Sequence, residues 1–230
     1  MARLEAPLHT VLLTGFEPFG GEAVNPSWLI AQALHGERIG SHGVIVAQQL
    51  PCVFGRAQQA LLEALAAHRP LLVLALGQAA GRCDLSVERI AINVDDARIP
   101  DNAGASPIDE PVLPGGPAAY FSTLPIKAMV AAMREAGLPA SVSQTAGTFV
   151  CNHVFYALMH ALQASKSRRP AARGGFMHVP LLPEQAVACP GQPSLPLATL
   201  VQGTRVALAA ALRVAMSEGA DLRVAGGSVA

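Results

Sequence analysis

Short apolar runs alternate with amphipathic segments along almost the whole chain. The apolar runs end at glycine or at polar residues, which is the pattern of strands buried on both faces. The segments between them carry apolar residues at helical spacing, which predicts helices packed on a sheet. The predicted strands are 10–15, 43–50, 70–77, 85–93, 140–145 and 174–182, and the predicted helices are 26–34, 54–68, 125–137, 151–165 and 197–219.

The elements follow one another as strand and then helix with short links, which favours parallel pairing of the strands. We therefore predict an α/β fold with three layers, α/β/α, around a mostly parallel, twisted central sheet. No change of composition, linker or internal repeat divides the sequence, so residues 1–230 are predicted to form a single domain. The long link 94–123 is rich in Pro, Gly and Asp, and loops of that length are usually functional or mobile.

The charge of the protein is balanced. Sixteen Lys and Arg residues offset sixteen Asp and Glu residues, and the basic residues form no run or stripe. This argues against nucleic acid or an anionic membrane as the main partner. A formal net charge of zero also removes one barrier to self-association, which favours a homo-oligomer.

The sequence also predicts a cytoplasmic protein. Its opening segment, MARLEAPLHT, has charged and polar residues and a proline where a secretory signal needs an apolar stretch. No apolar run approaches the roughly 18 residues that span a membrane. The four cysteines lack C-x-x-C spacing, so we interpret them as reduced thiols and not as zinc ligands or disulfides: Cys52, Cys83, Cys151 and Cys189.

Four segments are expected at one edge of the sheet, because sites in open α/β folds gather beyond the carboxyl ends of the strands. They are GFEPFGG after the first strand, GQAAG after the third, AGTFVC after the fifth, and His178 in the sixth. The first segment contains Phe16 and Phe19. Core packing is the default for these rings, and a flat apolar slot for a small ring is the sharper alternative.

Cys151 stands at the predicted first turn of a helix. Unpaired N–H groups at a helix start favour the thiolate, which is the reactive form of cysteine. Most free cysteines are nevertheless small buried apolar residues, and we keep that interpretation for the other three. For Cys151 the position alone leaves a nucleophile and a buried filler about equally supported.

Only one histidine suits the role of base for this thiol. His153 and His160 point away from Cys151 on the same helix because of the helical repeat. Four others follow helices or precede the first strand, and they fall at the opposite edge: His9, His35, His42 and His68. His178 alone ends a strand at the predicted edge.

Glu88 is the candidate for orienting that histidine. If 85–93 is one strand, Glu88 shares a face with Ser86, Ile90 and Ile92, where an unpaired carboxylate would be costly. A salt bridge with an arginine would satisfy the carboxylate as well as His178 would, so both interpretations stay open.

We predict no metal site and no phosphate loop. Asp95, Asp96 and Asp101 lie in a loop without histidine partners, and we interpret them as solvated carboxylates. The two glycine-rich turns lack G-K-[ST] and a complete G-x-G-x-x-G, so neither is a specific phosphate signal.

With these residues in view, the sequence resembles the cysteine-type pyroglutamyl peptidases, also called pyrrolidone-carboxylate peptidases, nearly from end to end. The resemblance is carried by LLTGFEPFGG with NPS after it, GQAAGRCDLSVERIAINVDDARIPDN, SVSQTAGTFVCNHVFY and FMHVPLLPEQ. It implies that Cys151 is the nucleophile, that His178 is its base, and that Glu88 is the third catalytic residue.

The same resemblance implies hydrolysis of the bond after an N-terminal pyroglutamyl residue, so peptides with N-terminal pyroglutamate are the expected partners. It implies no metal or organic cofactor, and a cytosolic homo-oligomer that is commonly a tetramer. Phe16 and Phe19 match the family's aromatic slot for the lactam ring. Gln78 and Arg98 match positions that the family keeps close to its active centre.

Three other functions compete with this one. A cysteine amidase acting on glutamine or another small amide would use the same thiol and histidine, and it would accept a free α-amine. A silent binding protein would be free to lose Cys151, His178 and Glu88, all of which are present. A phosphate-dependent nucleoside enzyme has a similar architecture, but fold is not function, and the phosphate loop is missing.

Overall fold

A computed structural model describes residues 8–165 and 171–227 of the chain. Most of the opening segment MARLEAPLHT, which was compared with a secretory signal, lies outside the described residues. The main sheet has seven strands in the order β2-β3-β1-β4-β9-β5-β8, and β6 and β7 pair separately. The strands are β1 (His9–Phe16), β2 (Arg38–Ile39), β3 (Gly43–Leu50), β4 (Leu72–Gln78), β5 (Leu85–Glu88), β6 (Ile90–Ile92), β7 (Ala119–Phe121), β8 (Ala140–Ser143) and β9 (Arg173–Val179).

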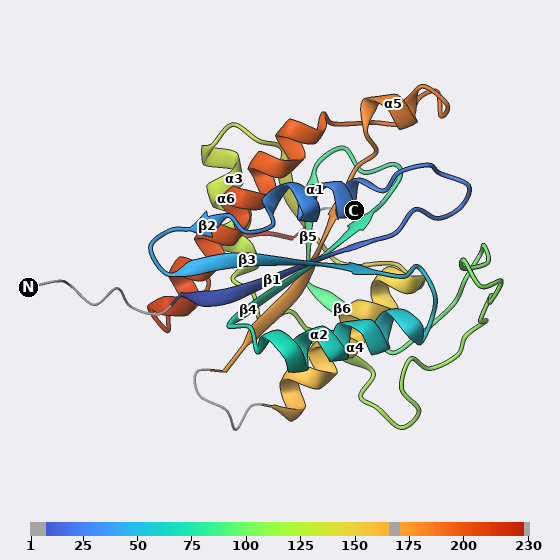
Figure 1. Ribbon diagram of the computed structural model, residues 1–230, viewed down its shortest axis with the longest axis horizontal. Helices are drawn as coiled ribbons and strands as arrows, with labels where there is room; N and C mark the ends of the chain where they lie inside the picture. Colours follow the sequence, from blue (N-terminus) through green and yellow to red (C-terminus); the bar gives the residue numbers. More distant parts are fainter. Residues whose placement is uncertain (1–7, 166–170, 228–230) are drawn as a thin grey trace, which may run out of the picture.

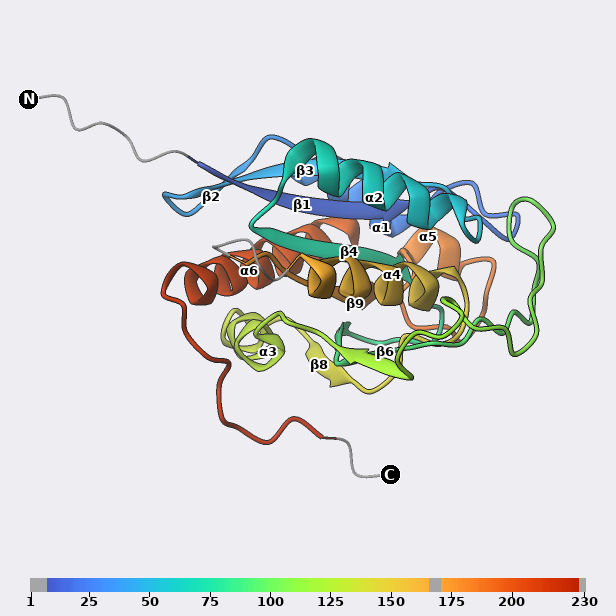
Figure 2. The ribbon, with the colours of Figure 1, turned by 90° about the horizontal axis from the view of Figure 1, so that it is seen from below.

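Helices cover both faces of this sheet. They are α1 (Pro26–Leu34), α2 (Arg56–His68), α3 (Ile126–Glu135), α4 (Val150–Ala164), α5 (Pro183–Ala186) and α6 (Leu197–Met216). The core consists of two clusters of buried apolar residues, one on each face of the sheet. One cluster joins α1, α3 and α6 to the sheet, and the other joins α2 and α4 to the opposite face. Figure 1 shows the two groups on opposite sides of the strands, and in Figure 2 α2 and α4 lie in front of them. The predicted α/β fold with helices on both sides of a mostly parallel sheet is confirmed.

Strand β4 illustrates why an unbroken apolar run forms the middle of the sheet. Its side chains alternate between the two faces, so both faces need apolar residues. Leu72, Leu74 and Leu76 pack into the cluster with α1 and α6, whereas Val73 and Ala75 pack into the cluster with α2 and α4. All five are completely buried, and α4 packs over the face of β4 that carries Val73 and Ala75.

The sheet is parallel only in its middle. β3, β1, β4 and β9 pair in parallel, whereas β5 is antiparallel to β9 and parallel to β8. The link 79–84 is too short for a parallel crossover, which needs roughly a dozen residues, so the chain reverses after β4. β8 therefore runs opposite to β4, and the expectation that AGTFVC leaves a parallel strand was wrong. The segment 144–149 instead turns the chain back toward the site.

The predicted strand 85–93 is two strands in different sheets. The break falls at Arg89, whose N–H donates to the carbonyl of Ser143, the last residue of β8. Beyond it, β6 leaves the main sheet and pairs with β7. The expectation that Ile90 and Ile92 share the face of Glu88 was therefore wrong. Ser86 and Glu88 do alternate on one strand.

Helix α6 is long and apolar enough, by length and composition alone, to cross a membrane. Leu200, Ala207, Leu208 and Ala211 on this helix pack into the core cluster that covers the sheet. The helices of a folded core meet the same criteria of length and composition, and we interpret α6 as such a helix.

Candidate active site

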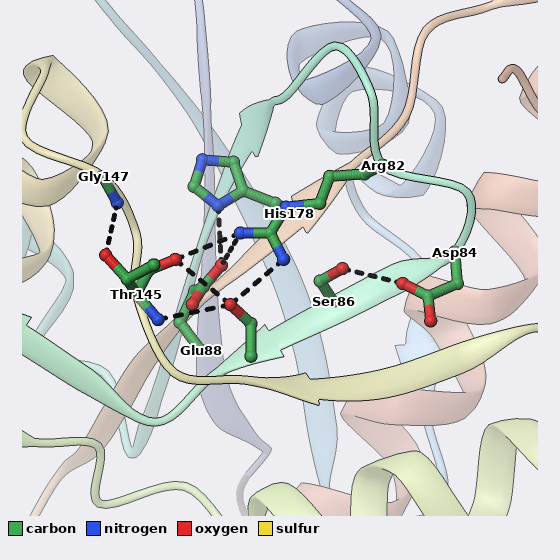
Figure 3. A network of polar contacts seen from close by, with 8 residues as sticks. Arg82, Asp84, Ser86, Glu88, Thr145, Gly147 and His178 are labelled. Carbon is green, nitrogen blue, oxygen red and sulfur yellow. Dashed lines mark hydrogen bonds and ion pairs between the residues drawn. The ribbon is translucent and has the colours of Figure 1, made fainter. Parts of the chain in front are cut away.

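Glu88 and His178 are hydrogen-bonded between two neighbouring strands. Ser86 on β5 is the register partner of His178 on β9, and Glu88 lies two residues further along the same face. The Nδ1 atom of His178 lies 2.8 Å from Oε1 of Glu88, and the two side chains are 5% and 0% exposed (Figure 3). With Nδ1 engaged by the carboxylate, Nε2 is the ring nitrogen left for a second partner.

The thiol of Cys151 lies against β4, the strand that pairs with β9, which carries His178. Cys151 is the second residue of α4. A Cβ atom on Gly77 would come within 2.7 Å of the Cys151 sulfur, so the thiol lies directly on β4. Gly77 is in turn the register partner of His178 on β9. The thiol and the imidazole therefore occupy the same face of two adjacent strands.

The surroundings of Cys151 stabilise its neutral form. Burial raises the pKa of the thiol, and the neighbouring Cys52 and Glu88 raise it further. No side chain caps the start of α4, so unpaired N–H groups remain there. The uncapped helix start favours the thiolate, and burial of the thiol works against it.

Glu88 also pairs with an arginine, so both alternatives left open by the sequence are realised. Nη2 of Arg82 lies 3.3 Å from Oε1 of Glu88, the same oxygen that contacts His178. Oε2 of Glu88 is buried without a hydrogen-bond partner among the described residues. Sequence reasoning missed Arg82, whose one signal was its place in the turn that precedes the Glu88 strand.

The aromatic residues divide between the core and the surface. Phe16 is 2% exposed and contacts the Phe176 ring, so it belongs to the core beneath the site. Phe19 is half-buried and contacts Phe149, with ring centroids 6.0 Å apart. Phe149 also meets Phe54 edge-on at 5.4 Å. The sequence analysis missed Phe149, although it stands two residues before Cys151.

Gln78 and Arg98 occupy different settings near the site. The Oε1 atom of Gln78 accepts a hydrogen bond of 3.2 Å from Gln185, which is buried on α5. Arg98 is exposed. The backbone two residues before it is anchored, because Asp96 donates to and accepts from Thr148. Arg98 therefore follows a segment tied to the residues that lead into α4.

The loop carboxylates are not all solvated, which corrects the sequence analysis. Asp95 is buried and its Oδ2 lies 2.8 Å from Nδ1 of His153, the partner that the sequence analysis did not foresee. Nε2 of His153 accepts from the Gly55 N–H, so this histidine is fully engaged. Asp101 is buried too and accepts backbone N–H groups, whereas Asp96 is exposed. Among the described residues no group of three His, Cys, Asp or Glu side chains could hold a metal ion.

A cavity of about 730 Å³ lies at the other end of the central strands. Leu71, just before β4, and Arg173, the first residue of β9, line it together with Tyr120 and Met159. Gly77 and His178 are near the opposite ends of the same strands. None of the described lining residues is a cysteine or histidine, so the candidate chemistry lies with Cys151.

Comparison with known proteins identifies the relatives of this chain. A family model described as pyroglutamyl peptidase matches residues 9–214. The chain belongs to the pyroglutamyl peptidase family. A pyrrolidone-carboxylate peptidase of Cupriavidus taiwanensis is 64% identical over 96% of this chain and 100% of its own length. The resemblance found in the sequence is thus confirmed, and the protein is a hydrolase of the cysteine peptidase class.

Two solved structures of family members share the fold. The pyroglutamyl peptidase I of Bacillus amyloliquefaciens has a TM-score of 0.85 at 46% identity, covering 93% of this chain and 100% of its own. The pyrrolidone carboxyl peptidase of Thermococcus litoralis has a TM-score of 0.89 at 36% identity, covering 95% and 100%. The family fold therefore extends over nearly all of this chain.

Proposed function

We propose that this protein hydrolyses the bond after an N-terminal pyroglutamyl residue of peptides, with Cys151 as nucleophile, His178 as acid and base, and Glu88 as the residue that orients His178. The observation that carries the proposal is the buried Glu88–His178 hydrogen bond on the face where the thiol lies. Family membership supports the substrate class.

In the first step His178 acts as a general base. Because burial raises the pKa of Cys151, the resting thiol keeps its proton. The thiol makes no hydrogen bond within residues 8–165 and 171–227, and such contacts often form only when substrate binds. Nε2 of His178 takes the thiol proton as the sulfur attacks the pyroglutamyl carbonyl carbon, which forms a tetrahedral intermediate.

The intermediate then breaks down in two stages. The C–N bond breaks, and His178 gives its proton to the departing amine of the shortened peptide. The acyl group remains on Cys151 as a thioester. His178 next takes a proton from water, whose oxygen attacks the thioester, and the thiol leaves with that proton as free pyroglutamate is released. Glu88 keeps Nδ1 protonated and stabilises the imidazolium in both stages.

The negative oxygen of each intermediate needs nearby donors. The Cys151 N–H at the uncapped start of α4 supplies one. We assign the second to Arg98, which follows the segment that Thr148 anchors. Losing one donor of this kind typically costs about 100- to 1000-fold in kcat.

Specificity follows from the lack of charge on pyroglutamate. Its lactam ring has one neutral N–H and one C=O, and no ammonium group. We propose that Phe19 and Phe149 flank the ring, that Phe16 supports them from the core, and that Gln78 binds the lactam amide. An ordinary N-terminus would bury its ammonium against these rings, at a cost that corresponds to roughly a thousandfold or more in rate.

The proposal includes a homo-oligomer in the cytoplasm, a tetramer by resemblance to the family. The four cysteines are unpaired, as expected for a reducing compartment. The reaction as written uses a thiol, a base and hydrogen-bond donors, so it needs no metal or organic cofactor.

Release of aminomethylcoumarin from its pyroglutamyl, alanyl and glutamyl derivatives tests the function. We expect hydrolysis of the pyroglutamyl compound alone, abolished by Cys151→Ala and retained by Cys83→Ala, which removes an exposed cysteine. Equal hydrolysis of the alanyl or glutamyl compound would favour an amidase. A folded, reduced wild type without turnover would instead indicate a silent binding protein.

A further inference from the structure

Arg82 connects the catalytic carboxylate to the segment that leads to the nucleophile. It lies in the link between β4 and β5, six residues before Glu88. Its Nη2 lies 3.3 Å from Oε1 of Glu88 and donates to the Thr145 carbonyl at 3.1 Å. Its Nη1 donates to Oγ of Ser143 at 3.1 Å. Figure 3 shows the contacts of Arg82 with Glu88 and Thr145. One guanidinium thus engages two parts of the chain that are far apart in sequence.

The charge of Arg82 matters because Glu88 is completely buried. A buried carboxylate without a counter-charge is strongly disfavoured in its ionised form. Arg82 is the one Lys or Arg in an ion pair with Glu88 among the described residues. The other titratable groups near Glu88 are His178 on β9 and Cys151 on α4. The Asp84 carboxylate is engaged elsewhere, because it accepts a hydrogen bond from the hydroxyl of Ser86 on β5.

The contacts of Arg82 continue toward the helix start. Ser143 and Thr145 form a turn in which the Ser143 hydroxyl donates to the Thr145 carbonyl at 3.1 Å. Oγ1 of Thr145 then accepts from the Gly147 N–H at 3.1 Å. The next residues enter α4, which carries Cys151. The position of Arg82 therefore bears on the nucleophile as well as on the carboxylate.

We propose that Arg82 is a positioning residue for the reaction, which supplies the counter-charge for Glu88 beside His178 and holds the 143–145 segment in register with that carboxylate. This inference rests on the proposed function. The planar guanidinium has several donors in a fixed fork, so it serves Glu88, Ser143 and Thr145 together. A lysine ammonium would keep the charge without the fork, and a glutamine would remove the charge.

The test compares Arg82→Gln and Arg82→Lys with wild type, using the pyroglutamyl coumarin substrate over a range of pH. Arg82→Gln should lower kcat about 10- to 100-fold, the effect of losing a charge-assisted hydrogen bond, with KM little changed. In the pH profile of kcat/KM, the acidic limb of this variant should also move to higher pH. Without the guanidinium, the Glu88–His178 pair takes up a proton more readily. Arg82→Lys should keep the acidic limb near that of wild type, with a smaller loss in kcat.

Two controls separate this role from a merely structural one. Arg205→Gln removes an arginine–carboxylate pair on the surface, with Glu37, and should leave kcat and the pH profile unchanged. In a Glu88→Gln background, Arg82→Gln should add little further loss, because it acts through a carboxylate that is already gone.

The inference is overturned if Arg82→Gln keeps the kcat and acidic limb of wild type, or if it costs as much in the Glu88→Gln background as alone. If Arg82→Gln does not fold, Arg82→Lys and Ser143→Ala decide, since both should lower kcat without moving the acidic limb. A wild type that fails to hydrolyse the substrate overturns the proposed function and this role together. An active wild type with unaffected Arg82 variants overturns the role alone.

Discussion

Gly77→Ala is expected to displace Cys151, the proposed nucleophile, through a single methyl group. The added Cβ would lie 2.7 Å from the Cys151 sulfur and 2.8 Å from Cζ of Phe176. The backbone of Gly77 does not have a positive φ, so alanine is excluded by space and not by conformation. Phe176 is buried between other rings and cannot give way freely.

The size of the effect follows from these distances. The sulfur has to withdraw by about 0.7 Å or more to restore an ordinary van der Waals contact. A misplacement of about 1 Å in a reacting group can cost about 100-fold in rate, so we expect kcat to fall about 10- to 100-fold. Overpacking of this kind also costs about 1 to 3 kcal/mol of folding free energy.

Gly43→Ala is the matched control for this substitution. Its Cβ would lie 2.6 Å from Cδ2 of Leu212, at the far end of the sheet. Both variants should lose comparable free energy of unfolding in urea, but only Gly77→Ala should lose kcat on the pyroglutamyl coumarin substrate. A Gly77→Ala enzyme with the kcat of wild type, or an equal loss in both variants, would refute the placement of the thiol against β4.

Three further predictions concern groups at or near the site. Asp95→Asn weakens a buried hydrogen bond to His153 on α4, so it should lower the free energy of unfolding by about 2 kcal/mol and the Tm by about 4 to 8 °C. The exposed Asp96→Asn should leave the Tm unchanged. Equal Tm values for the two variants would contradict a stabilising role of Asp95. Burial and, to a smaller extent, nearby acidic groups raise the pKa of Cys52 to about 12. Iodoacetamide near pH 7 should therefore label the exposed Cys83 and spare Cys52. Alkylation of Cys151, followed by mass spectrometry, should keep rising above about pH 8.5, the pKa of a free thiol, and a plateau below neutral pH would show that a thiolate is already formed.

The candidate catalytic residues stood out in the sequence because they sit in local patterns. Cys151 opens a helix and His178 lies near the end of an apolar strand, so periodicity and alternation marked both positions. The parallel strand expected before Cys151 was nevertheless wrong, because β8 runs opposite to β4. Their relation to Glu88 depends on β5 running antiparallel to β9. The sequence analysis predicted a mostly parallel sheet and missed that reversal, although the short link 79–84 was a signal for it, because a parallel crossover needs roughly a dozen residues.

The residues that sequence reasoning missed act through contacts between distant segments. Arg82 reaches the turn at Ser143, and Asp95 reaches His153 on α4. No periodic pattern marks such pairs, and charged residues in loops are usually solvated. Phe149 was missed for a similar reason, since its ring contacts connect three segments that fold together only in the tertiary structure.

Trapping of the acyl group by hydroxylamine tests whether Cys151 forms a thioester. Wild-type enzyme is given the pyroglutamyl coumarin substrate with increasing hydroxylamine, and the products are separated into pyroglutamate and pyroglutamyl hydroxamate. We expect hydroxamate to replace pyroglutamate in proportion to hydroxylamine, and Cys151→Ala to yield neither product. Release of aminomethylcoumarin without any hydroxamate, or turnover that persists in Cys151→Ala, would show that no thioester forms on Cys151.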